Sequence, residues 1–171
     1  MTELSSARAH VISVSNRAAA GVYEDTTGPR IVAALQEAGF GTVTSDVVPD
    51  GEPVAEALKA AVTDGVALVV TTGGTGLSPT DRTPEMTRPL LDREVPGVAE
   101  AIRAYGVSKG VPTASLSRGL VGLAGTTLVV NLPGSTGGVK DGLAVLMPIL
   151  GHMVDQVAGG DHTRADEGGA S

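Results

Sequence analysis

Short apolar runs alternate with longer amphipathic stretches through most of this chain. The runs are rich in Val, Ile and Leu, and most of them are closed by Gly, Pro, Asp or Asn. Such runs are typical of strands buried on both faces, as in a parallel sheet that is covered by helices. The pattern predicts strands at 10–15, 42–48, 66–72 and 126–132.

Between these runs, apolar residues recur every three or four positions, which is the period of a helix with one buried face. In the stretch 29–38, for example, Ile31 and Leu35 share one face. Pro29 suits the first turn of this helix, and Gly39 suits a position just beyond its end. Helices are predicted at 29–38, 53–62 and 138–157, with one or two more at 84–104 that break near Pro96 and Gly97.

Strands that alternate with helices predict an α/β fold, here a three-layer α/β/α sandwich with a mostly parallel sheet. A chain of 171 residues is of the size of one domain. We expect this domain to span residues 1–157. Residues 158–171 have little apolar content and are predicted to form a disordered tail.

The segment 66–85 carries the clearest sign of a ligand site. Its strand leads into a turn where Gly73, Gly74 and Gly76 allow backbone amides to approach a ligand without a Cβ in the way. Thr83 can cap a following helix, whose positive end would then face the same place. These features favour a site for an anion such as phosphate.

Asp81 is unexpected beside an anion site, because its carboxylate would repel phosphate directly. A hard cation such as Mg²⁺ can bridge a carboxylate to phosphates, so Asp81 is a candidate ligand for that ion. Asp50 follows the end of the strand 42–48, and ligands of such sheets bind beyond the C-terminal strand ends. The two aspartates could therefore share one crevice. The alternative for each is a turn residue at the surface.

Composition narrows the function further. The formal net charge of −7 and the pI near 4.8 argue against a nucleic-acid surface. The absence of cysteine excludes disulfides, thiolate zinc sites and a thiol nucleophile. There is no apolar run of signal-peptide or membrane length, so we expect a cytoplasmic protein without a membrane partner. With only two Tyr and one Phe, the chain would hold a flat heterocycle mainly with backbone groups and aliphatic side chains.

Several enzyme classes lack their motifs in this chain. The segment after the first predicted strand has no G-x-G-x-x-G of a Rossmann dehydrogenase, and GSTGGVK has the wrong spacing for a P-loop. The G-x-S-x-G of serine hydrolases is absent, and the three histidines offer no obvious triad partner.

The segment TTGGTGLSPTDRTPE resembles the signature of the molybdopterin-binding family of molybdenum cofactor biosynthesis, the MogA/MoaB type of molybdopterin adenylyltransferases. Further blocks similar to that family occur in order along the chain. They are SVSNRAAAGVYEDTTGP, VVPD, LLDREVPGVAEAIR, LSRG and NLPGS. The resemblance covers about residues 8–157, and colinear blocks are far more specific than one glycine turn.

This resemblance implies Mg-ATP-dependent adenylylation of molybdopterin with release of pyrophosphate. It implies that Asp50 and Asp81 are the catalytic pair, which binds Mg²⁺ and orients ATP. Arg118 could clamp a phosphate in bidentate fashion, or it could form a surface ion pair. Together with the glycine turns, the resemblance assigns substrate binding to Ser15, Gly73, Gly74, Thr75, Gly76, Ser117, Arg118, Asn131, Pro133, Gly134 and Ser135.

Members of the resembled family are commonly trimers, and the helices predicted at 84–104 and 138–157 carry more apolar residues than one sheet face covers. We therefore expect a homotrimer, with a downstream partner that inserts molybdate. Two other functions stay open. One is a molybdopterin-binding scaffold without adenylyl transfer, against which the retained aspartates count. The more distant one is a pyridine-nucleotide-processing hydrolase, against which the lack of a second domain counts.

A few positions depart from the family pattern. Asn16 stands where the first motif usually has Asp, so one charge is lost on the expected nucleotide side. Thr136 and Gly137 follow NLPGS where Pro and often Lys are usual, and Lys140 could supply that cation from one turn later. Ala67 stands where an Asp often precedes TTGG. These departures change charge and leave the expected fold intact.

Overall fold

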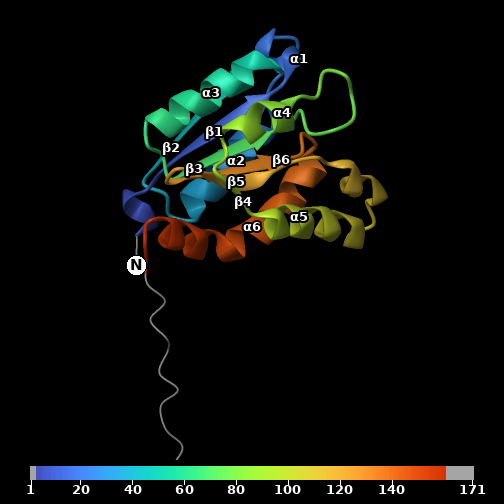
Figure 1. The fold of residues 1–171 in the computed structure, drawn as a ribbon. Helices are drawn as coiled ribbons and strands as arrows, with labels where there is room; N and C mark the ends of the chain where they lie inside the picture. The colour runs from blue at the N-terminus through green and yellow to red at the C-terminus, as the bar shows by residue number, and fades with distance from the viewer. Residues whose placement is uncertain (1–2, 161–171) are drawn as a thin grey trace, which may run out of the picture.

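The computed structural model describes residues 3–160, and within them a six-stranded sheet forms the middle layer (Figure 1). The strand order is β2-β1-β3-β6-β5-β4. Of these strands, β2, β1, β3 and β6 run parallel, and β5 and β4 extend the sheet in antiparallel fashion. The strands are β1 Arg8–Val14, β2 Thr42–Val48, β3 Leu68–Thr72, β4 Arg93–Glu94, β5 Val121–Ala124 and β6 Thr127–Leu132.

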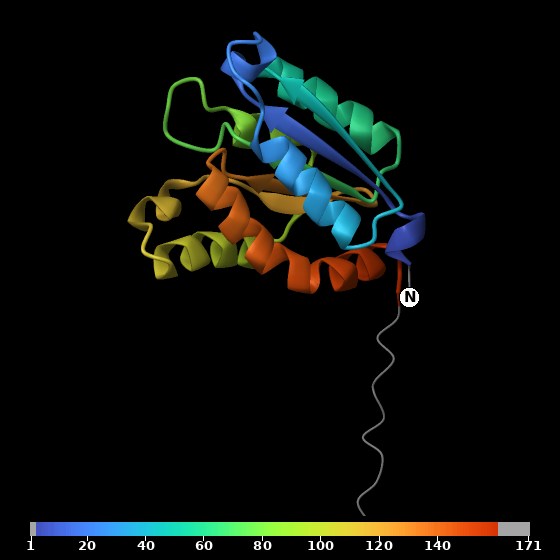
Figure 2. The same cartoon turned by 180° about the vertical axis from the view of Figure 1, so that it is seen from behind.

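Helices cover both faces of this sheet (Figures 1 and 2). One face carries α3 and α4, and the other carries α2, α5 and α6. The α-helices are α1 Asn16–Ala19, α2 Thr27–Glu37, α3 Glu52–Thr63, α4 Thr83–Thr87, α5 Pro96–Ser108 and α6 Thr136–Val157. Short 3₁₀ helices are η1 Leu4–Ser6, η2 Arg88–Leu90 and η3 Pro112–Leu116.

The centre of the sheet is buried on both sides, as the apolar runs predict. Every residue of β3 and β6 is buried. Because side chains alternate along a strand, Leu68 and Val70 join the apolar cluster under α2 and α6, whereas Val69 joins the cluster under α3. The predicted three-layer α/β/α sandwich with a mostly parallel sheet is confirmed.

The region between β3 and β6 differs from the prediction. No helix continues through residues 91–95. There, Asp92 and Val95 donate backbone hydrogen bonds to Leu123 and Val121, and β4 pairs with β5. The break therefore precedes Pro96, which begins α5. The strand β5 was missed because Gly122 interrupts its apolar run. A Cβ at Gly122 would lie 2.6 Å from the carbonyl oxygen of Arg93, so close strand pairing requires glycine there.

The other boundaries lie close to the predicted ones. The long closing helix begins at Thr136 and ends at Val157, and Ala158 to Gly160 complete its last turn through backbone hydrogen bonds. Residues 161–171 of the predicted tail lie outside the described part of the chain. Within residues 3–160, no helix combines the length and the apolar character needed to cross a membrane.

Candidate functional site

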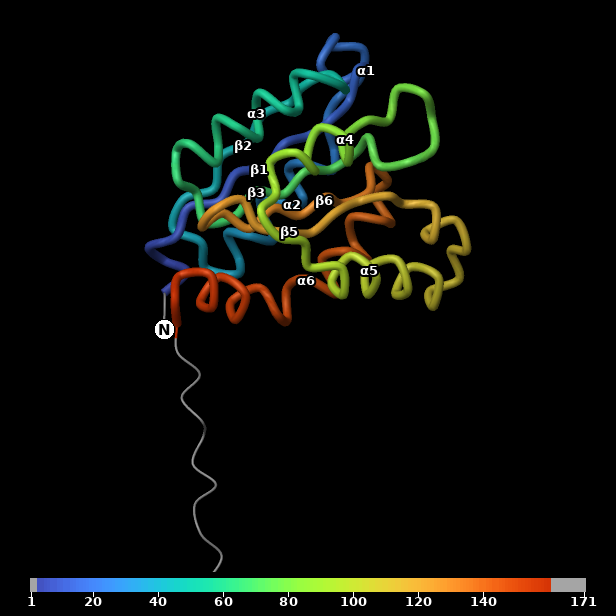
Figure 3. Tube along the Cα trace, viewed as in Figure 1, coloured from blue at the N-terminus to red at the C-terminus, as the bar shows by residue number. Residues whose placement is uncertain are grey.

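The loops after β3 and β6 leave the sheet at the same end, beyond the C-terminal ends of the parallel strands (Figure 3). The amide of Gly73 donates to the carbonyl oxygen of Leu132 at 3.1 Å. A Cβ at Gly134 would lie 3.0 Å from the Cα of Gly73. A Cβ at Gly73, where φ is 99°, would overlap the carbonyl oxygen of Val14. These glycines therefore let two loops pack backbone against backbone.

Asp50 lies in the loop that follows β2 and contacts the loop that follows β3. Its Oδ1 accepts the amide hydrogen of Arg82 at 3.0 Å, and its own amide donates to Oδ1 of Asn16 at 2.9 Å. Burial raises the pKa of Asp50 above its usual value, and the negative charge of Asp81 adds to this increase. The two aspartates are thus near enough to repel one another, as the prediction of a shared crevice requires.

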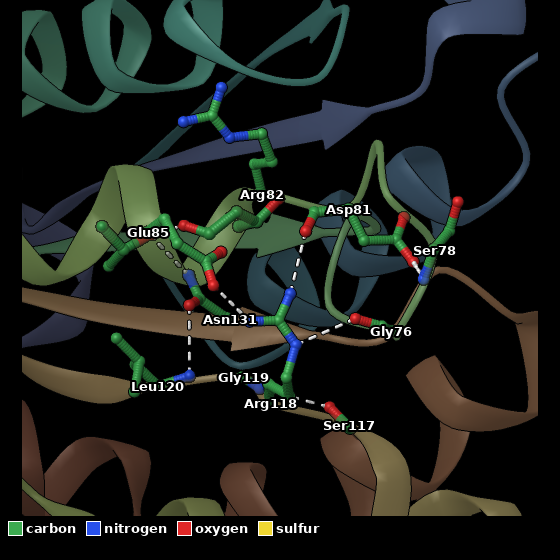
Figure 4. Close-up of polar contacts among 12 residues, drawn as sticks. Gly76, Ser78, Asp81, Arg82, Glu85, Ser117, Arg118, Gly119, Leu120 and Asn131 are labelled. Atoms are coloured by element: carbon green, nitrogen blue, oxygen red, sulfur yellow. Dashed lines mark hydrogen bonds and ion pairs between the residues drawn. The ribbon is translucent and has the colours of Figure 1, made fainter.

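Asp81 serves its own turn as well. Its Oδ2 accepts the amide hydrogen of Ser78 at 3.2 Å (Figure 4). A Cβ at Gly76 would lie 2.8 Å from the same oxygen, so glycine makes room for the carboxylate. Asp81 can therefore stabilise its own turn through Oδ2 and still offer Oδ1 to a ligand, so the two roles that the sequence left open are compatible.

The carboxylate pair fits Mg²⁺. Oδ1 of Asp81 accepts no hydrogen bond from residues 3–160, whereas the Asp50 carboxylate accepts from the backbone amides of Arg82 and Gly51. A cation between the two side chains would also offset the repulsion that raises the pKa of Asp50. Within the described residues, no group of three or more His, Cys, Asp or Glu side chains is placed to hold a metal. Two carboxylates suffice for Mg²⁺ when substrate phosphates and water complete its coordination.

A cleft of about 420 Å³ opens beside Asp81. Its walls come from the loop after β3, the loop after β6, the first turns of α6, and the facing sides of α5 and η3. The predicted site residues that line it are Gly74, Thr75, Gly76, Asp81, Ser117, Pro133, Gly134 and Ser135. Those that lie outside its lining are Ser15, Asp50, Gly73, Arg118 and Asn131.

Arg118, expected either to clamp a phosphate or to form a surface ion pair, lies outside the lining of the cleft. Its Nε donates to the carbonyl oxygen of Gly76 at 2.9 Å, and its Nη2 donates to that of Asp81 at 2.8 Å (Figure 4). Its Nη1 pairs with Glu85, whose pKa falls below its usual value because of this arginine. The guanidinium therefore holds the loop that carries Asp81, and a phosphate would have to displace these contacts.

Asn131 is a core residue and not a wall of the cleft. Its side chain is buried, with Oδ1 accepting the amide hydrogen of Leu120 at 3.1 Å. Its Nδ2 donates to the hydroxyls of Thr71 at 2.9 Å and Thr87 at 3.2 Å. These bonds tie β6 to its neighbour strand and to α4, so the asparagine of NLPGS positions the loop that follows it.

Thr83, the predicted helix cap, and Ser135 behave differently at the starts of their helices. Thr83 is the first residue of α4 and not its cap, because its hydroxyl donates to the carbonyl oxygen of Gly73 at 2.9 Å. Ser135 does cap α6, accepting the amide hydrogen of Gly138 at 3.0 Å. The helix end beside the cleft is therefore that of α6, and the five-residue α4 is too short to replace it.

Comparison with known proteins agrees with this architecture. Residues 10–152 match the protein family described as a probable molybdopterin binding domain. The chain belongs to this family.

Named relatives share the family domain. The chain is 41% identical to a molybdopterin adenylyltransferase of Haemophilus influenzae, over 78% of this chain and 69% of that protein. It is 43% identical to a molybdenum cofactor biosynthesis bifunctional protein of Synechococcus elongatus, over 90% of this chain and 48% of that protein. The chain thus spans about half the length of the bifunctional relatives that it matches.

A solved structure gives the same fold. The molybdopterin biosynthesis Mog protein from Mycobacterium ulcerans is 54% identical and superposes with a TM-score of 0.86, covering 89% of this chain and 99% of that one.

The structure shows where the residues that depart from the family pattern lie relative to the candidate site. Asn16 contacts Asp50 directly, so it keeps an acceptor for the Asp50 amide without adding a third carboxylate. Gly137 lines the cleft, whereas Lys140 is exposed and lies outside its lining. Ala67 lies immediately before β3, at the opposite end of the sheet from the cleft. Only the first two departures touch the candidate site.

Sequence reasoning missed the wall formed by α5, η3 and α6. Arg103 lines the cleft, and its Nη1 donates to the carbonyl oxygens of Ser117 at 3.2 Å and Gly119 at 3.0 Å. It is the one Lys or Arg among the described residues that line the cleft. Asp141 lines the same wall. The sequence did contain an indication of Arg103, because it is the last residue of the family-like block LLDREVPGVAEAIR. Helical periodicity alone, however, does not distinguish this arginine from other polar residues on the same helix.

Proposed function

We propose that this chain transfers the adenylyl group of Mg-ATP to molybdopterin, with release of pyrophosphate. The observation that carries the proposal is the pair Asp50 and Asp81, held by hydrogen-bonded loops beside a cleft at the C-terminal strand ends. Relatives that are named molybdopterin adenylyltransferases support it. Binding of molybdopterin alone would not require two carboxylates that repel one another.

In the proposed reaction, an oxygen of the terminal phosphate of molybdopterin attacks the α-phosphorus of ATP. The bond from that phosphorus to the oxygen bridging to the β-phosphorus breaks, and pyrophosphate leaves with the electron pair. Mg²⁺, when bound, neutralises charge on the phosphates. The protein contributes position and charge, so no covalent intermediate is needed.

Each element of the site has a part in this scheme. Asp50 and Asp81 would hold the metal through carboxylate oxygens. The turn at Gly74 to Gly76 and the start of α6 offer backbone amides to phosphate. Arg103 supplies the cation of the cleft through Nε and Nη2, which donate to no other described residue.

We also propose that the chain acts as a homotrimer and passes its product to a protein that inserts molybdate. Exposed apolar side chains support an interface between copies: Val47 on the edge strand β2 is 42% exposed, and Val107 on α5 is 43% exposed. Sedimentation at micromolar concentration should show a trimer. A stable monomer would remove this part of the proposal.

The direct test mixes the purified chain with molybdopterin and Mg-ATP and follows adenylylated molybdopterin and pyrophosphate by chromatography. Both products should appear in equal amounts and only with Mg²⁺. Tight molybdopterin binding without either product would point instead to the scaffold function.

A further inference from the structure

The wall of the cleft formed by α5 and α6 contains a carboxylate that the proposed reaction does not use. Asp141 lies in the second turn of α6 and lines the cleft. Its Oδ2 would be 4.0 Å from a Cβ at Gly106, which places it over α5. Among residues 3–160, no hydrogen bond or ion pair engages Asp141. Its acceptor oxygens are therefore available to a ligand.

Aliphatic side chains form much of the cleft wall on the side of Asp141, and Arg103, Thr113 and Ser117 line the same cleft. The cleft there is walled by Ile102 and Ala114, together with Val111 and Leu116, whose side chains are 45% and 48% exposed. Exposed aliphatic groups around one carboxylate match a flat heterocycle that shows polar atoms along one edge. No aromatic side chain is present among the described residues that line the cleft, so the ring would lie against aliphatic groups.

We infer that Asp141 recognises the pterin ring, and specifically its 2-amino and N3–H edge. This inference rests on the proposed function, which supplies a pterin substrate. A carboxylate is an acceptor with two oxygens, and the pterin edge presents two parallel N–H donors at matching spacing. Such bidentate, charge-assisted pairs are stronger than neutral hydrogen bonds and fix the orientation of the ring.

The same carboxylate disfavours the base of ATP. The Watson–Crick edge of adenine presents one amino donor beside the lone pair of N1, and a carboxylate oxygen would face that lone pair. Asp141 therefore sorts the two substrates, with the pterin at the α5–α6 wall and the nucleotide phosphates near Asp50 and Asp81. A site that pairs both donors of one ring loses binding when either donor becomes an acceptor.

A ligand pair tests this assignment without ATP. The probes are 6-hydroxymethylpterin and 6-hydroxymethyllumazine, which differ in that the lumazine carries oxygen in place of the 2-amino group. Their own fluorescence reports binding cleanly, because the chain contains no tryptophan. The wild-type chain should bind the pterin roughly tenfold or more tightly than the lumazine, as expected for one charge-assisted hydrogen bond replaced by repulsion.

The variant Asp141→Asn should reverse this order. Its amide can donate to the 2-oxygen of the lumazine and accept from N3–H, whereas the pterin would meet one donor with another donor. Glu100→Gln is the matched control, since Glu100 is an exposed acid on α5 outside the lining of the cleft. It should retain the wild-type order. Equal melting temperatures of the variants would show that the fold is intact.

Two results would overturn the assignment: a wild-type chain that binds neither pteridine or does not discriminate between them, and an Asp141→Asn variant that keeps the wild-type order. These results are separable from failure of adenylyl transfer. A reversed order without adenylylated product would retain the pterin subsite and remove the proposed reaction. Product formation with unchanged KM for molybdopterin in Asp141→Asn would remove the subsite and retain the reaction.

Discussion

The two ends of the cleft are built in opposite ways. At the end near Asp81, side chains are tied to the protein: Arg118 holds two loop carbonyls and Glu85, and Asp50 holds the Arg82 amide. At the α5–α6 end, Asp141 has no partner in the described chain and Arg103 keeps two nitrogens free. The hydrogen bonds of the first end fix side-chain positions, as phosphate transfer requires, whereas the second end offers unused groups that can select a ligand.

This difference shows that a residue of a family motif can have one of two roles: it can support the fold of the site, or it can contact the ligand. The residues of the glycine-rich and NLPGS blocks are largely framework, as Asn131 and Gly73 show. A framework residue affects catalysis by fixing the position of its neighbours, and its loss should first appear as lost stability. A contact residue should change KM or turnover in a chain that stays folded.

The largest effect is expected at Asp81. Asp81→Asn keeps the acceptor for the Ser78 amide but removes the charge that attracts Mg²⁺. Turnover should fall on the order of 10²-fold or more, as for the loss of one electrostatic stabiliser. Molybdopterin affinity should persist because the pterin wall lies elsewhere. Steady-state kinetics and direct binding check both quantities.

The control for this substitution is Asp64→Asn, which removes the same charge from the exposed end of α3. It should leave turnover unchanged.

The double variant Asp50→Asn/Asp81→Asn tests whether both side chains act through one ion. If they do, its loss of turnover should be smaller than the product of the two single losses. Wild-type turnover in Asp81→Asn would leave that residue only its role in the turn.

The next effect is on stability. Asn131→Leu is similar in size but leaves the buried Leu120 amide without its acceptor and removes the donor to the hydroxyls of Thr71 and Thr87. The free energy of unfolding should fall by about 2–3 kcal/mol, measured by urea denaturation. If stability is unchanged while KM for molybdopterin rises, Asn131 contacts the ligand and is not framework.

The sequence predicts the sheet and its layers well because β3 and β6 are buried along their whole length, which leaves long apolar runs. It fails at β5, where close pairing requires Gly122 and the apolar run is broken. The requirement for glycine that hides β5 makes the ligand site easy to predict. Where backbones approach closely, only glycine fits, so the glycine turn before Asp81 stands out in the sequence.

The α5–α6 wall was not predictable in the same way. Asp141 and Arg103 lie on helices, where polar residues are normal at exposed positions. Only the crossing of the two helices shows that these positions face one cleft. For Arg118 the sequence allowed a phosphate clamp or a surface ion pair, and its hydrogen bonds to the carbonyl oxygens of Gly76 and Asp81 add a third role that the sequence did not indicate.

A pair of arginine variants contrasts the two ends. Arg103→Gln should raise KM for molybdopterin about tenfold, because the cation that lines the cleft is lost. Arg118→Gln should lower the free energy of unfolding by about 1–2 kcal/mol and reduce turnover, because the Asp81 loop loses its support. Thermal melts and kinetics on both variants distinguish the roles. An Arg118→Gln chain with native stability and a raised KM would restore the phosphate clamp.

The smallest effect is a gain in stability at Asp50. Burial, followed by the charge of Asp81, raises the pKa of this carboxyl in the folded chain, so its ionisation costs more in the folded state than in the unfolded state. The cost is absent at a pH below the unfolded pKa, where both states are protonated, and it is complete above the folded pKa.

The variant Asp50→Asn keeps an acceptor for the Arg82 amide without that cost. Without Mg²⁺, the variant should therefore be slightly more stable than wild type at pH 7, and the difference should vanish near pH 3. Urea denaturation at both pH values measures this, with Asp64→Asn as the exposed comparison. The same variant should also lose turnover. A gain in stability together with a loss of activity would show that the charge of Asp50 serves ligand binding and not the fold. A variant less stable than wild type at pH 7 would show that the carboxylate serves the fold instead.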